Sequence, residues 1–242
     1  MSIREIMSGL DRSKIAFWGS LGGFSLLASV ASTPAGASIA VSQMIIELKP
    51  GSSPATDIEI VNVSSDRSFI VVEPREIIRA GNTDEKPFFS PDPDRLGLLV
   101  SPNRLVLEPN QRRTLRIAAI HPASDRERVY RVTVKPVTGE VSGAESGLKL
   151  LVGYDLLVLV RPASIHSVLQ ARRDGQKLVI TNKGNSSVEL SDGKQCDQDR
   201  KSCRSLPSKR LYAGVSWEQS LTEFGAGEYR VRGAEGWTTM KF

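Results

Sequence analysis

The sequence predicts an all-β protein made of two immunoglobulin-like sandwiches. Its apolar residues fall in many short runs, 13 prolines and 20 glycines are available to separate them, and no convincing amphipathic helix is present. With 40% hydrophobic and 24% charged residues, the chain has the composition of a folded protein. Roughly seven strands over about 125 residues fit one sandwich, and the remaining residues, about 80, fit a second, smaller one.

Residues 1–37 have the three parts of a secretory signal peptide. A basic segment precedes the uncharged apolar stretch 15–31, and an Ala-x-Ala site predicts cleavage after Ala37. The alternative is a permanent membrane anchor, but about 17 apolar residues, several of them Gly or Ser, are marginal for crossing a bilayer. Because no second apolar span follows, we expect an exported protein without stable membrane insertion, in an oxidising compartment.

The first domain is expected to comprise residues 38–161. Within 57–63, apolar and polar residues alternate at first, which places Ile58 and Ile60 on one face of a strand. A polar, proline-rich loop is expected at 80–95. The runs that predict strands are 39–48, 57–63, 69–72, 77–78, 98–100, 105–107, 114–120, 129–134 and 148–160.

Arg161-Pro162 interrupts the longest of these runs, so the second domain is expected at 162–242. Its predicted strands lie within 177–182, 188–190, 206–211, 217–221, 229–231 and 238–242. Cys196 and Cys203 flank a polar loop, and in an exported protein such a pair predicts a local disulfide. The alternative, a redox or metal pair, is disfavoured because the spacing is not Cys-x-x-Cys and no histidine is near in sequence.

Composition and motifs argue against several functions. The chain carries 32 Lys and Arg against 27 Asp and Glu, a net charge of +5 without a dense basic run, so we expect no nucleic-acid partner. His121 and His166 lack metal-binding spacing, and two cysteines cannot form an all-cysteine zinc site. The phosphate-loop, dinucleotide and serine-hydrolase motifs are missing from the sequence. We therefore expect no metal, no cofactor and no enzymatic activity.

The run 148–160 is unusual because every position on one face is apolar. Its other face includes Lys149, Gly153 and Asp155, which are awkward deep in a core. One interpretation is a central strand buried between two layers. The other is an edge strand whose first half presents an apolar row outward, which would aggregate unless a partner covered it. Such an edge could add a strand to another protein.

The order of several motifs resembles the PapD-like periplasmic chaperones of the chaperone–usher pilus pathway. These motifs are Ile58-Glu59-Ile60-Val61-Asn62, Leu105-x-Leu107-x-Pro109, Arg116-Ile117, Tyr130-Arg131-Val132 and Arg161-Pro162. The second domain, with Gly184-Asn185 after a Leu-x-Ile-Thr-Asn run and the late cysteine loop, is similar to the alternative branch that includes the common pilus chaperones.

This resemblance implies a periplasmic chaperone with two immunoglobulin-like domains around an interdomain cleft. Such chaperones bind pilin subunits, lend each one a missing strand, and deliver it to an outer-membrane usher. The donor positions fall on Leu148, Leu150, Val152 and Tyr154. Burying each apolar donor would contribute about 1.5–3 kcal/mol before the cost of ordering the chains.

Two features depart from the better-known branch. That branch anchors the subunit's C-terminal carboxylate with an Arg on the first strand and a Lys four residues before Arg-Pro. Here 39–48 contains no Arg, and the second position is Leu157. Arg131 and Arg161 are the candidate replacements, with a structural ion pair or a solvated charge as the alternative for each. The acidic partner of the Arg before the linker falls near Lys135, so the resemblance predicts no equivalent ion pair for Arg161.

Two other functions are considered. A pilus subunit or adhesin would have one incomplete domain and a flexible N-terminal donor extension, whereas this sequence predicts two complete β domains. A carbohydrate-binding protein or hydrolase would need an aromatic platform or converging carboxylates. Aromatic residues are only 6% of the chain, and Trp217 and Trp237 are expected to pack within the second domain.

Overall fold

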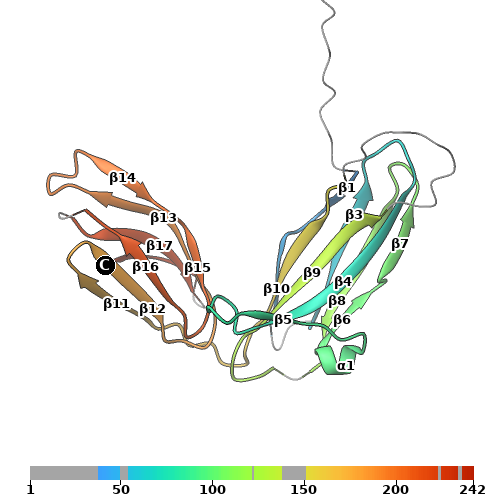
Figure 1. Ribbon diagram of the computed structural model, residues 1–242, viewed down its shortest axis with the longest axis horizontal. Helices are drawn as coiled ribbons and strands as arrows, with labels where there is room; N and C mark the ends of the chain where they lie inside the picture. Colours follow the sequence, from blue (N-terminus) through green and yellow to red (C-terminus); the bar gives the residue numbers. More distant parts are fainter. Residues whose placement is uncertain (1–37, 50–53, 122, 138–150, 223–224, 234–235) are drawn as a thin grey trace, which may run out of the picture. The chain divides into compact units, whose positions relative to one another are not determined.

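The computed structural model describes residues 38–49, 54–121, 123–137, 151–222, 225–233 and 236–242. Nearly all of the regular structure in this part is strand, with one short helix, α1 (Pro93–Leu96) (Figure 1). The predicted all-β class and the two sandwiches are therefore confirmed. The signal peptide 1–37 and its cleavage site at Ala37 lie outside the described residues.

Two sheets form the first sandwich. Sheet 1 contains, in spatial order, β1 (Ile39–Val41), β3 (Ala55–Asn62), β8 (Arg112–Ala119) and β6 (Leu98–Ser101). Sheet 2 contains β2 (Ile45–Leu48), β10 (Tyr154–Val160), β9 (Arg128–Val137), β4 (Ser68–Ile78) and β5 (Lys86–Phe88), while β7 (Arg104–Leu107) also pairs with β4. The two inner faces bury one apolar core between them.

Strand β3 shows how alternation positions its residues. Ile58 and Ile60 are buried in the core, as the sequence predicts, while Asp57 and Glu59 point outward. On the outward face Asp57 accepts hydrogen bonds from Arg116 of β8, its partner in the antiparallel register. Because successive side chains of a strand point to opposite faces, a strand with one buried and one solvated face alternates apolar and polar residues in this way.

The segment 80–95 is more ordered than the loop that its composition suggests. It contains β5 and leads into α1, whose N-cap Asp92 accepts a hydrogen bond from the amide of Asp94. Pro93 stands in the first turn, and Gly97 ends the helix in the left-handed conformation with φ of 81°. Each of these residues suits its position at a helix end.

Two smaller sheets form the second sandwich. Sheet 3 contains β11 (Leu169–Asp174), β12 (Lys177–Asn182) and β16 (Ser216–Ser220). Sheet 4 contains β14 (Cys203–Leu206), β13 (Val188–Cys196), β17 (Gly227–Gly233) and β18 (Gly236–Lys241), while β15 (Lys209–Leu211) pairs with β13. Since β10 ends at Val160 and β11 begins at Leu169, we propose a domain boundary after Arg161, between 38–161 and 162–242.

The predicted disulfide is present and joins Cys196 of β13 to Cys203 of β14, which face each other in the register. Closing so short a loop contributes about 2–3 kcal/mol in the chain-entropy model.

Trp217 packs with Tyr229 in the core, as expected, with ring centroids 6.0 Å apart. Trp237 also packs within the second domain, against Arg230 and Arg232, but it does so on the outward face of sheet 4 and is 46% exposed.

Candidate functional site

Strand β10 is buried on both faces over its second half. Leu156 and Val158 belong to the core of the first sandwich. Leu157 and Leu159 lie on the opposite face, in a small apolar cluster with Val129 of β9. For this half of the predicted run 148–160, the interpretation as a two-sided, central strand is correct.

The first half of β10 has an open side. Strand β2 pairs with β10 in parallel only from Leu157 to Val160, and the amide of Leu157 donates to the carbonyl of Met44 at 2.9 Å. Over Tyr154–Leu156, the strand's only partner among the described residues is β9. The edge of sheet 2 is therefore unpaired at the start of β10. In the sequence, this point follows the apolar residues Leu148, Leu150 and Val152.

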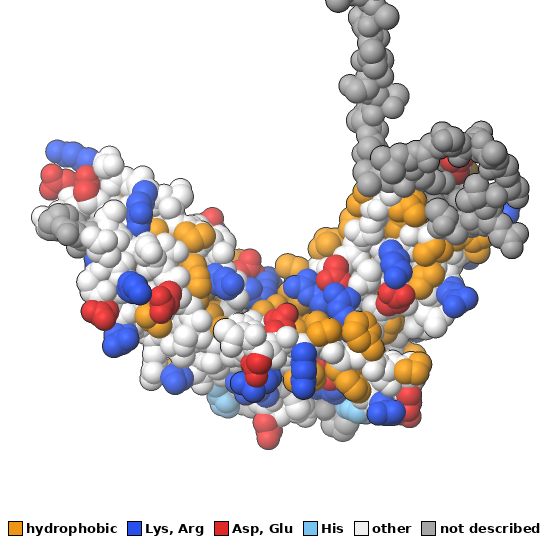
Figure 2. All heavy atoms as spheres, in the orientation of Figure 1, with side chains coloured by type: hydrophobic (Ala, Val, Ile, Leu, Met, Phe, Trp, Pro, Cys, Tyr) orange, Lys and Arg blue, Asp and Glu red, His pale blue; other side chains and the backbone are white. Residues whose placement is uncertain are grey.

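The candidate donor residues lie beside this open edge. Val152 lies two residues before the start of β10 and is 38% exposed. Tyr154 is half-buried against its own core, and its hydroxyl donates to the carbonyl of Ile39 at 3.0 Å. Leu148 and Leu150 lie outside the described residues. Figure 2 shows exposed hydrophobic side chains in several patches over the first sandwich.

Two arginines share one carboxylate on the outer face of sheet 2. Arg75 of β4 donates to both oxygens of Asp155, at 3.0 and 2.9 Å. Its other terminal nitrogen donates to Thr133 at 2.6 Å. Arg131 of β9 stands directly opposite Arg75 in the register, with its Nε 3.9 Å from an oxygen of Asp155. This group, which we call the Arg75–Arg131 pair, has a net positive charge and remains partly exposed.

The sequence identifies Arg131 as a candidate but misses Arg75. Arg75 follows Pro74 within β4, and nothing in its immediate sequence connects it with β9 or β10. Only the register brings Arg75, Arg131 and Leu157 into one row across three neighbouring strands. Arg131 is thus the cross-strand neighbour of Leu157, the position where the resemblance predicts a lysine.

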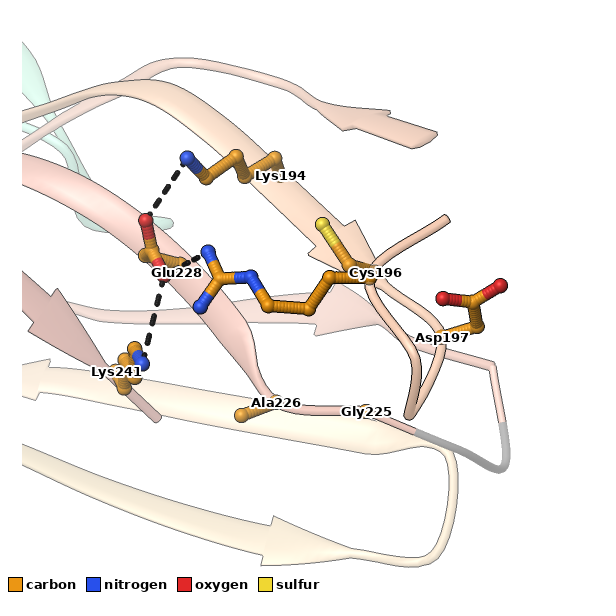
Figure 3. A pocket seen from close by; sticks show the side chains of 8 residues that line it. Lys194, Cys196, Asp197, Gly225, Ala226, Glu228 and Lys241 are labelled. Atoms are coloured by element: carbon orange, nitrogen blue, oxygen red, sulfur yellow. Dashed lines mark hydrogen bonds and ion pairs between the residues drawn. The ribbon is translucent and has the colours of Figure 1, made fainter. Parts of the chain in front are cut away.

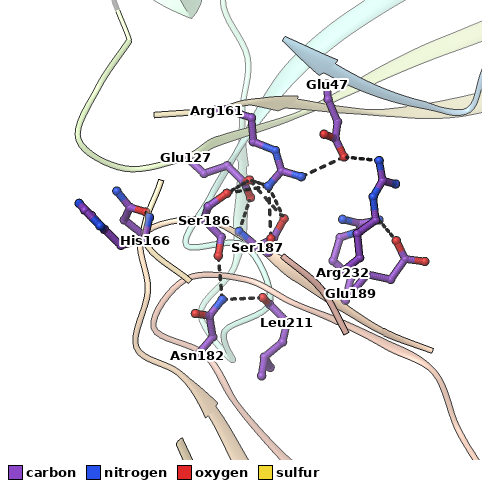
Figure 4. Close-up of polar contacts among 12 residues, drawn as sticks. Glu47, Glu127, Arg161, His166, Asn182, Ser186, Ser187, Glu189, Leu211 and Arg232 are labelled. Carbon is purple, nitrogen blue, oxygen red and sulfur yellow. Dashed lines mark hydrogen bonds and ion pairs between the residues drawn. The ribbon is translucent and has the colours of Figure 1, made fainter. Parts of the chain in front are cut away.

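Arg161 lies at the centre of a buried polar cluster and is 9% exposed (Figure 4). Its guanidinium pairs with Glu47 of β2 at 2.9 Å and also with Glu127. It donates further hydrogen bonds to Ser186 and to Ser187. Both serine hydroxyls in turn donate to Glu127. Both terminal nitrogens of the guanidinium are therefore engaged by this protein's own groups.

The resemblance predicted no equivalent of the family's ion pair for Arg161, but Arg161 does have acidic partners, which agrees with the alternative of a structural ion pair. Lys135 pairs with Glu73 at 2.8 Å, as part of a different cross-strand contact. Val160 faces Arg128 in the antiparallel register, so the next residues along both strands, Arg161 and Glu127, are also opposite each other. The partner, Glu127, lies directly before the start of β9 rather than near the end of that strand.

The positive charge of Arg161 also lowers the pKa of the Glu47 carboxyl group. Burial alone would raise the pKa of Glu47, but the charge of Arg161 and its hydrogen bond outweigh burial and lower the pKa below the ordinary 4.5. A carboxylate whose pKa is lowered on folding stabilises the folded state at pH values above 4.5. That contribution is lost as the pH falls through the folded-state pKa.

We therefore expect Glu47→Gln to flatten part of the acid dependence of stability. The free energy of unfolding of the unmodified chain should decline as the pH is lowered from about 5 to 3, and the decline should be shallower in the variant. Urea unfolding at a series of pH values measures both slopes. Equal slopes would show that Glu47 does not couple its ionisation to folding.

Other kinds of site are not found in the described part of the chain. No group of three or more His, Cys, Asp or Glu side chains could hold a metal ion there. No helix among those residues is long and apolar enough to cross a membrane.

Comparison with known proteins identifies relatives by both sequence and fold. The family model described as pili and flagellar-assembly chaperone, PapD N-terminal domain, matches residues 38–166, which is more than half of the chain. No match is found among curated proteins.

Solved structures of fimbrial chaperones share the fold. The class 5 fimbriae chaperone CfaA is 21% identical, with a TM-score of 0.63, covering 84% of this chain and 98% of CfaA. The SafB chaperone, solved with the SafA pilin of Salmonella enterica, is 17% identical, with a TM-score of 0.60, covering 85% and 96%. The E. coli chaperone DraB is 18% identical, with a TM-score of 0.59, covering 85% and 97%.

Proposed function

This chain belongs to the pili and flagellar-assembly chaperone family, and we propose that it binds pilin subunits by lending them the open edge of β10. Pilus chaperones are not enzymes, so the function depends on a binding surface rather than on a reaction. The observation that carries the proposal is the side of β10 that is unpaired, among the described residues, over Tyr154–Leu156, with exposed Val152 two residues before the strand begins.

The chemistry of this edge suits strand addition. The main-chain N–H and C=O groups on the unpaired side can bond to an extended segment of a subunit. The row Leu148, Leu150 and Val152 would then enter the subunit's own core, and Tyr154 would remain at the junction with the chaperone's core. We further propose that the protein acts in the periplasm after removal of residues 1–37, and that it hands the subunit to an outer-membrane usher.

The basic experiment is co-expression with pilins from the same organism. Pulling down the chain from the periplasm should recover a soluble complex with one subunit per chaperone, while the subunit alone should aggregate or be degraded. If the chain instead polymerises by itself, it acts as a pilus subunit. If it recovers no subunit, the proposed function is wrong.

We assign the anchor for the subunit's C-terminal carboxylate to the Arg75–Arg131 pair. Of the two candidates in the sequence, Arg161 is buried and already bonded to two carboxylates, whereas Arg131 is partly exposed. A second carboxylate beside Asp155 would give each guanidinium its own anion. Charge-assisted hydrogen bonds of this kind are worth about 1.5–3 kcal/mol.

Arg131→Ala should weaken binding of a peptide with the subunit's C-terminal sequence by about tenfold or more. Arg113→Ala, at an exposed position near the start of β8, is the matched control and should leave the affinity unchanged. The same peptide with an amidated C-terminus should bind weakly to the unmodified chain and no more weakly to Arg131→Ala. Equal losses for the acid and the amide would contradict the assignment.

A further inference from the structure

Strand β18 is a second open edge, in the other sandwich. It is the outer strand of sheet 4 and pairs only with β17 in the part of the chain that the structure describes. Gly227 and Phe242 exchange both hydrogen bonds, at 3.1 and 2.8 Å. Because bonded and non-bonded pairs alternate along an antiparallel ladder, the N–H and C=O groups of Trp237, Thr239 and Lys241 point away from β17.

The inner side of this edge is apolar. Thr238 and Met240 line a cavity of about 210 Å³, together with Leu169, Val188 and Val231. Met240 is 38% exposed, so the cavity reaches the surface beside β18. An added strand could place alternate apolar side chains over this opening.

The outer side of the same edge is cationic. Arg230 and Arg232 of β17 stack on Trp237, with their guanidinium carbons 4.8 and 5.9 Å from the ring centroid. Lys241 faces Glu228 in the register and shares that carboxylate with two further cations, Lys194 at 2.9 Å and Arg200 at 3.4 Å (Figure 3). Glu228 is therefore contacted by three cations. Arg230 also pairs with Asp192 at 3.1 Å and Arg232 with Glu47 at 3.8 Å, so the cations on this face still outnumber the carboxylates.

We propose that β18 accepts an extended acidic segment of another protein as an additional strand. Carboxylates at alternate positions of that segment would face Arg230, Arg232 and Lys241, and the intervening apolar side chains would cover the cavity beside Met240. Charge selects this occupant, because a second copy of β18 would bring the same cations together across the edge. The proposal is independent of subunit binding at β10.

The probe is a soluble peptide of alternating glutamate and valine, titrated into the purified chain while amide resonances are followed by NMR. The shifts should centre on Trp237, Thr239 and Lys241, and binding should weaken as salt is raised because surface charges are screened. An alternating lysine and valine peptide should not bind. A peptide of the same composition with glutamate and valine in separate blocks should bind at least tenfold more weakly.

Three variants separate the contribution of the main chain from that of the positive charges. Thr239→Pro removes an amide that points to the free edge and should reduce affinity at least tenfold, while Thr239→Val keeps the amide and should bind within twofold of the unmodified chain. The double variant Arg230→Gln, Arg232→Gln should also lose at least tenfold, with an unchanged thermal unfolding curve as its check. Equal binding of the lysine peptide, shifts confined to β10 or β11, or self-association through β18 would each overturn the proposal.

Discussion

Arg161→Met is expected to reduce the free energy of unfolding by about 3–5 kcal/mol. The reason is the side chain of Glu127, which is 2% exposed and would remain as a buried charge without its cation. The serine hydroxyls that bond Glu127 cannot supply the lost charge. Urea or thermal unfolding measures the loss directly.

A matched control and a double variant make this test specific. Arg116→Met breaks the exposed pair with Asp57, where both side chains are at least 44% exposed, and should cost far less stability than Arg161→Met because solvent screens this pair. Combining Arg161→Met with Glu127→Leu removes the stranded carboxylate and should recover much of the loss. If Arg161→Met costs no more than Arg116→Met, the cluster around Arg161 does not stabilise the fold.

Val152→Glu is expected to lower recovery of a co-expressed pilin from the periplasm by at least tenfold. Inside a subunit's groove, this change would replace a buried apolar side chain, worth about 1.5–3 kcal/mol, with a carboxylate that has no partner. Leu150→Glu, in the same row, should have the same effect. Affinity capture of the chain, followed by quantification of the subunit, gives the measurement.

Leu99→Glu is the matched control for this prediction. Leu99 is an apolar residue of the same sandwich with the same exposure as Val152, 38%, but it lies on β6 in sheet 1. It should recover as much subunit as the unmodified chain. A loss from Leu99→Glu equal to that from Val152→Glu would show a general effect of surface charge instead of a specific binding edge.

Features that depend on local patterns could be predicted from the sequence. Alternation placed Ile58 and Ile60 in the core, and the polar loop between Cys196 and Cys203 predicted their disulfide. The run 148–160 supported two interpretations, and the second half of β10 follows the buried one. The helix at 93–96 was not predicted, because the polar, proline-rich composition of 80–95 indicates a loop, although Asp92, Pro93 and Gly97 are typical helix-end residues.

Features that depend on register could not be predicted in this way. Glu127 faces Arg161, and Arg75 faces Arg131, only because antiparallel pairing aligns distant segments. A shift of one residue in either strand would send these side chains to the opposite face. The exposure of Trp237 also follows from its place on the outer face of an edge strand, which composition alone does not reveal.

Amide hydrogen exchange at Asp155 tests the central claim, that β10 lends its open edge to a subunit, most directly. Since the amide of Leu157 points toward β2, that of Asp155, two residues earlier, points to the same side, where β2 does not reach. Exchange at Asp155, followed by NMR, should slow at least tenfold in the subunit complex, while Leu156, already bonded toward β9, should exchange slowly with or without the subunit. Unchanged exchange at Asp155 in a saturated complex would contradict the account.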